Sequence, residues 1–92
     1  MKNPSAMVVT TAAGETAVFT GKGFFDGVII TSNLTNDVTV LVEDGTTEKV
    51  TYRLPGTSDC DSFPLPRGIA ITGGLNVTVT GTGAQATVLY SV

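Results

Sequence analysis

The chain has 92 residues, a formal net charge of −3 and a single cysteine. This length predicts one domain with a small core, and one cysteine excludes an internal disulfide. The few Lys and Arg residues are scattered, which argues against nucleic acid as a partner because basic patches supply most of that affinity. No apolar run approaches the roughly 18 residues of a membrane helix, so we expect no membrane partner; the first residues also lack the apolar run of a signal peptide.

The composition predicts a weakly charged surface. Charged residues make up 14% of the chain, and its polar residues include sixteen threonines. A small domain without a disulfide is only marginally stable on its own. We therefore expect a homo-oligomer, or docking onto a larger body, in which neighbours cover these surfaces.

Short β-rich runs follow one another along the chain, separated by turn signals about every ten residues. This pattern predicts an all-β fold, a single antiparallel β-sandwich of about eight strands, with a jelly roll as one option. The expected strands are Met7–Thr11, Glu15–Thr20, Gly23–Thr31, Asp37–Glu43, Thr47–Leu54, Gly68–Thr72, Leu75–Thr80 and Gln85–Ser91.

We expect residues 1–13 to form an N-terminal arm or a first edge strand, followed by a β-sandwich domain that spans residues 14–92. The segment is small and polar apart from Met7, Val8 and Val9. These three residues are candidate interface residues if the arm orders against a partner. Simple fraying of the chain terminus is the alternative.

Two hairpins are predicted, one around Asp44-Gly45 and one around residues 81–83, since glycine adopts the positive φ that tight turns require. Strict alternation leaves Leu41 and Leu89 mid-strand on otherwise polar faces. They are candidate subunit contacts, with solvent exposure or a second packed layer as the alternatives. The residues expected to be buried are Val38, Val40, Val42, Tyr52, Leu75, Val77, Val79, Val88 and Tyr90.

The segment Pro55–Pro66 contains three prolines. Because proline cannot donate to a strand ladder, we expect a long loop or a connection that crosses between sheets.

The polar residues do not form a recognisable catalytic or metal site. The chain has no histidine, which excludes a hydrolase triad. Cys60 lies between Asp59 and Asp61, whereas a nucleophilic thiolate needs nearby positive charge; the cluster is a solvated turn or, alternatively, a cation site. Asp37 and Glu43 are about 20 Å apart along one strand, too far for a glycosidase pair. We therefore expect no enzyme, no cofactor and no metal.

Four stretches between Lys22 and Tyr90 carry a family resemblance. They are GFFDGVIIT, VTVLVEDG, PLPRGIAI and the closing hairpin GLNVTVTGTGAQATVLYSV. Their order resembles that of small β-sandwich virion proteins of tailed bacteriophages. The resemblance covers about three quarters of the chain and brings no catalytic residue with it.

The resemblance implies a structural role in the virion. The first expectation is a capsid decoration or cement protein, often a homotrimer, which stabilises contacts between major capsid subunits on the capsid surface. Its other partners would be further virion proteins, and assembly would take place in the reducing host cytoplasm. The alternative is a module of the tail, neck or fibre that binds a glycan or a host receptor, with an aromatic or polar pocket near Pro55–Pro66.

Overall fold

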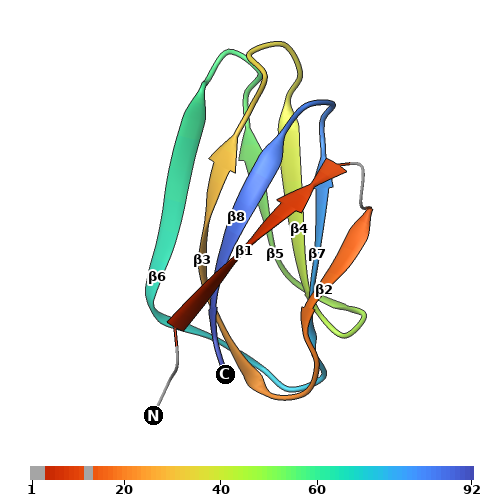
Figure 1. Ribbon diagram of the computed structural model, residues 1–92, viewed down its shortest axis with the longest axis vertical. Coiled ribbons are helices and arrows are strands. Elements are labelled where there is room, and N and C mark those ends of the chain that lie inside the picture. Colours follow the sequence, from red (N-terminus) through yellow and green to blue (C-terminus); the bar gives the residue numbers. More distant parts are fainter. Residues whose placement is uncertain (1–3, 12–13) are drawn as a thin grey trace.

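The chain folds into two four-stranded antiparallel sheets packed face to face, which confirms the predicted all-β sandwich (Figure 1). The structure is a computed structural model and describes residues 4–11 and 14–92. No helix among these described residues is long and apolar enough to cross a membrane. The strands are β1 (Pro4–Thr10), β2 (Glu15–Phe19), β3 (Gly23–Thr31), β4 (Val38–Asp44), β5 (Thr47–Leu54), β6 (Cys60–Ile71), β7 (Leu75–Thr80) and β8 (Gln85–Ser91).

The strand order is that of a jelly roll. Sheet A has the order β1-β8-β3-β6, and sheet B has the order β2-β7-β4-β5. The first strand therefore pairs with the eighth, the second with the seventh, the third with the sixth and the fourth with the fifth. Apart from the β4–β5 hairpin, every connection passes from one sheet to the other, so the loops gather at the two ends of the sandwich (Figure 1).

The β4–β5 hairpin forms around Asp44-Gly45 as expected, with Gly45 at a φ of 62°. The Asp44 carboxylate also holds the neighbouring β6–β7 loop: it accepts hydrogen bonds from the backbone N–H groups of Gly73 (2.7 Å) and Thr72 (3.0 Å). These two bonds hold the pKa of Asp44 below its usual value. Asp44 therefore has a structural role in fixing this end of the sandwich.

The segment Pro55–Pro66, expected to be a long loop or a connection that crosses between sheets, does cross from sheet B to sheet A over residues 55–59. The expectation is wrong for its second half, because β6 begins at Cys60. β6 is an edge strand, so one side of its backbone needs no ladder partner and proline is tolerated there. Its pairing with β3 runs over residues 60–64 and 69–71 and is interrupted between them, where Gly68 has a φ of 71°. The prolines at positions 64 and 66 thus lie at and within an irregular stretch of an edge strand.

The core lies between the two sheets and is formed mostly by valines. The valines and the leucine expected inward from both hairpins are buried, whereas Tyr52 and Tyr90 are half-buried. Tyr52 lies on the edge strand β5 and stacks against Phe63 of β6, with ring centroids 4.7 Å apart, so this pair closes one side of the sandwich. Tyr90 packs in the same way against Phe19. The fully buried large side chains include Phe25, Val28, Ile30, Val40, Val42, Ile71, Leu75, Val77 and Val88.

Candidate functional site

The outer face of sheet A is uncharged at every position where its strands pair. Residues that pair directly across neighbouring strands project on the same side, so the pairing registers define this face. Asp26 lies between paired positions, and its carboxylate accepts a hydrogen bond from the Ser91 hydroxyl. The paired positions, which we call the uncharged face, are Pro4, Ala6, Val8 and Thr10 of β1; Gln85, Thr87, Leu89 and Ser91 of β8; Phe24, Gly27, Ile29 and Thr31 of β3; and Cys60, Ser62, Pro64 and Ala70 of β6.

Three aliphatic side chains lie close together in the middle of the uncharged face. Val8 and Ile29 are 56% and 39% exposed, and both pair with Thr87, one from each side. Leu89 is half-buried, two residues along β8 from Thr87, and pairs with Ala6 and Gly27. Because small residues flank Leu89, a partner surface could reach the whole group.

An interruption of the β3 ladder determines which residues of that strand face outward. The pairing register shifts between Phe25 and Gly27, so Asp26 is the extra residue of a bulge. After the bulge, Val28 and Ile30 are buried and Ile29 points outward. Ile29 was not among the predicted interface residues. A signal was present in the sequence, because three consecutive aliphatic residues in a strand cannot all face the core.

The outer face of sheet B has the opposite character. Its paired positions, which we call the acidic face, carry several carboxylates, and Glu43 pairs directly with Glu48. Partial burial, followed by the charges of Glu15 and Glu48 and a hydrogen bond with Glu15, raises the pKa of Glu43. The acidic face comprises Glu15 and Ala17 of β2; Asn76, Thr78 and Thr80 of β7; Thr39, Leu41 and Glu43 of β4; and Glu48, Thr51 and Arg53 of β5.

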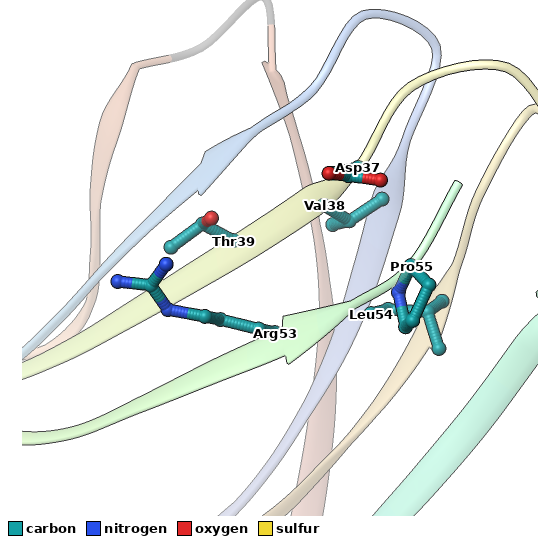
Figure 2. Close-up of a pocket in the computed structure, with 6 residues that line it drawn as sticks. All are labelled: Asp37, Val38, Thr39, Arg53, Leu54 and Pro55. Atoms are coloured by element: carbon teal, nitrogen blue, oxygen red, sulfur yellow. The ribbon is translucent and has the colours of Figure 1, made fainter.

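A shallow pocket of about 230 Å³ lies where β4 begins and β5 ends. Figure 2 shows Thr39 and Arg53 at one end of it and Asp37 and Pro55 at the other. The Asp37 carboxylate already accepts a hydrogen bond from the Gly56 N–H at 2.8 Å. Arg53 therefore supplies the pocket's charged donor, and no aromatic ring lines the pocket among the described residues.

The Asp59-Cys60-Asp61 cluster does not converge on a common point. Cys60 is exposed, and it pairs with Thr31 on the uncharged face, while Asp61 pairs with the buried Ile30 and so projects on the other side of β6. Among residues 4–11 and 14–92, no group of acidic and cysteine side chains is placed to hold a metal ion.

The five predicted interface residues separate into three groups. Val8 and Leu89 lie near each other on the uncharged face. Leu41 lies on the opposite side of the molecule, half-buried among threonines and glutamates of the acidic face. Val9 is buried and Met7 packs against the core, so neither side chain lies on the outer face of sheet A, where a partner could cover it.

Comparisons with protein-family models, with curated proteins and with solved structures found no match.

Proposed function

We propose that this chain is a non-enzymatic structural protein of a bacteriophage virion, a capsid decoration protein that stabilises contacts between major capsid subunits. The proposal combines the resemblance described above with the chemistry of the two outer faces. The jelly roll agrees with it, since capsid proteins use this fold, but lectins use it too and a fold does not define a function.

The single observation that carries the proposal is the uncharged face. An antiparallel sheet exposed to water usually alternates apolar residues inward with polar residues outward. Here Val8, Ile29 and Leu89 break that rule together on one face, whereas the acidic face has a single large aliphatic residue, Leu41, among its paired positions. Covering the paired positions removes apolar area from water and buries no charged side chain among them, while the Asp26 carboxylate lies beside Ser91 at one end of the face. Depletion of charged residues is typical of the centre of protein interfaces.

The two faces also define an orientation on the shell. The uncharged face would lie against the capsid, and the acidic face would point into solvent, where its carboxylates stay hydrated. A sheet face about four strands wide and seven residues long measures roughly 19 Å by 24 Å. This area is comparable to the surface that one partner buries in a small interface.

The test is co-sedimentation of the purified protein with undecorated capsids. Ile29→Lys places a charge at the centre of the uncharged face, and Leu41→Lys makes the same kind of change on the acidic face as a control. We expect Ile29→Lys to lose capsid binding and Leu41→Lys to retain it. Equal loss in both variants, or no binding of the unmodified protein, would contradict the proposal. Point substitutions are preferable to removal of the N-terminal segment, because β1 belongs to sheet A.

The pocket beside Pro55 supports a second candidate function, a tail, neck or fibre module that binds a glycan or host receptor. Arg53 and Thr39 could donate hydrogen bonds to sugar hydroxyls or to an acidic sugar. Binding of the protein to host cells or soluble glycans, weakened by Arg53→Ala and unaffected by Ile29→Lys, would favour this function over capsid decoration.

A further inference from the structure

Strand β1 has the least protected edge of the two sheets. A strand at the edge of a sheet leaves backbone N–H and C=O groups unpaired, and proteins usually guard such edges with charges, prolines, bulges or short length. β1 pairs with β8 over seven consecutive residues without a register shift, from Pro4 with Ser91 to Thr10 with Gln85. Its sequence, PSAMVVT, has no charged residue and no proline after the first position.

The other three edge strands, β2, β5 and β6, each have at least one feature that hinders pairing with a further strand. β2 is five residues long, begins with Glu15 and has a register shift. β5 carries Glu48, Lys49 and Arg53, and its pairing with β4 is also shifted. β6 contains two prolines and a long interruption of its ladder. The contrast singles out β1 as the edge available for strand pairing.

We propose that β1 pairs antiparallel with β1 of a second copy, joining two A sheets into one eight-stranded sheet. Full overlap of the seven residues places Met7 beside Met7 of the second copy, on a twofold axis, and Ala6 beside Val8 of the second copy. This register keeps both uncharged faces on the same side of the joined sheet, because even-numbered residues pair with even-numbered residues and odd-numbered with odd-numbered. Neither strand brings a charge to the junction.

Self-pairing suits the charge distribution of the chain, whose net charge is −3. Glu43 and Glu48 lie on sheet B toward the β5 side, and Asp59 and Asp61 lie at the far edge of sheet A. Glu15 is the first residue of β2 and so follows the β1–β2 connection, and a twofold axis through Met7 would place the Glu15 of the second copy at the opposite end of the joined strands. Two negatively charged chains can therefore meet along β1 without bringing these carboxylates together.

The contact is small, so the association should be weak and reversible. Two strands of seven residues meet along only about 24 Å, so the surface area buried between them is well below that of a standard interface. We expect a dissociation constant of about 100 μM. The contact joins two copies, whereas the virion resemblance implies a trimer. Pairing along β1 does not depend on capsid binding.

Sedimentation velocity over a concentration series tests the contact. Val8→Lys introduces a lysine at the edge, whereas Ile29→Lys introduces one on the same face but on the internal strand β3. We expect Val8→Lys to raise the dissociation constant at least about tenfold and Ile29→Lys to change it less than about twofold. Equal weakening by both variants would indicate packing through the face and overturn the inference. So would a chain that stays monomeric at about 1 mM.

Disulfide cross-linking tests the register in a chain with Cys60→Ser. Residues paired directly across antiparallel strands have Cα atoms about 4.5–5.5 Å apart, within the range of a disulfide. Met7→Cys should therefore cross-link two copies on mild oxidation. Ser5→Cys lies on the same strand and the same side, but about 14 Å from its counterpart, and should not. Cross-linking of Ser5→Cys but not Met7→Cys would overturn this register.

Discussion

Gly27, the one glycine among the paired positions of the uncharged face, should not be replaceable without a large loss of stability. It follows the β3 bulge with a φ of 134°, in the region that residues with a side chain rarely adopt. A Cβ atom built there would lie 2.5 Å from the Phe63 carbonyl oxygen and 2.9 Å from the Pro64 Cα atom. Both atoms belong to the backbone of β6, so no side-chain rotation can relieve the overlap.

The free energy of unfolding should fall by several kcal/mol in Gly27→Ala. The strained φ contributes about 1–3 kcal/mol, and forcing β3 and β6 apart contributes about 1–3 kcal/mol more. The sum of about 2–6 kcal/mol compares with a total stability of about 5–15 kcal/mol for typical domains. Gly14→Ala is the matched control, because Gly14 has a φ of 65° but a Cβ atom added there would have no atom within 4 Å. It should cost only about 1–2 kcal/mol.

Urea unfolding followed by circular dichroism measures both variants. We expect the Gly27→Ala midpoint to lie well below that of Gly14→Ala, or the variant to be unfolded in buffer. Hydrogen exchange should also show faster exchange along residues 60–64, where β6 pairs with β3. If the two variants lose the same stability, the close approach of the two backbones does not limit this position.

Three further predictions concern charge and packing. Asp44→Asn should lower the urea midpoint at neutral pH; since the folded pKa of Asp44 is lowered from 3.8, the difference from the unmodified chain should shrink as the pH falls below that value. Glu43→Gln should act in the opposite sense, because the raised pKa of Glu43 means that its charged form costs stability; the gain should be present at neutral pH and absent below pH 4.5. Val77→Ala should lower the free energy of unfolding by about 2–3 kcal/mol, because Val77 is fully buried, whereas Val8→Ala should change it by less than about 0.5 kcal/mol.

The sequence predicted the strands well where alternation and a turn signal coincide. In β4 and β7 buried residues alternate with more exposed ones, and the valines assigned to the core are buried there. β6 was only partly predicted, because its prolines argued against a strand. They are tolerated since β6 lies at the edge of sheet A, and the position of a strand in a sheet follows from the whole fold. The local sequence around Pro64 does not contain that information.

The candidate site was predictable only in part for a similar reason. Leu41 and Leu89 have the same appearance in sequence, each an aliphatic residue on a polar strand face. Sheet order separates them: Leu89 has Val8 and Ile29 as near neighbours, whereas Leu41 has threonines and carboxylates. An interaction surface across several strands depends on pairings between distant parts of the chain, and single-strand patterns cannot supply these.

The jelly-roll order also governs when the chain can fold. β8 lies between β1 and β3, so sheet A cannot form until the last strand has been synthesised. At a synthesis rate of about 5–20 residues per second, roughly 4–16 s pass between the synthesis of β1 and that of β8, the only described strand that pairs with it. Only the β4–β5 hairpin can form from adjacent strands, and folds dominated by distant pairings are slow, typically in the range of milliseconds to seconds. The uncharged strand β1 is therefore open to aggregation during synthesis, and a chain interrupted before β8 leaves β1 and β3 without the neighbour that they share.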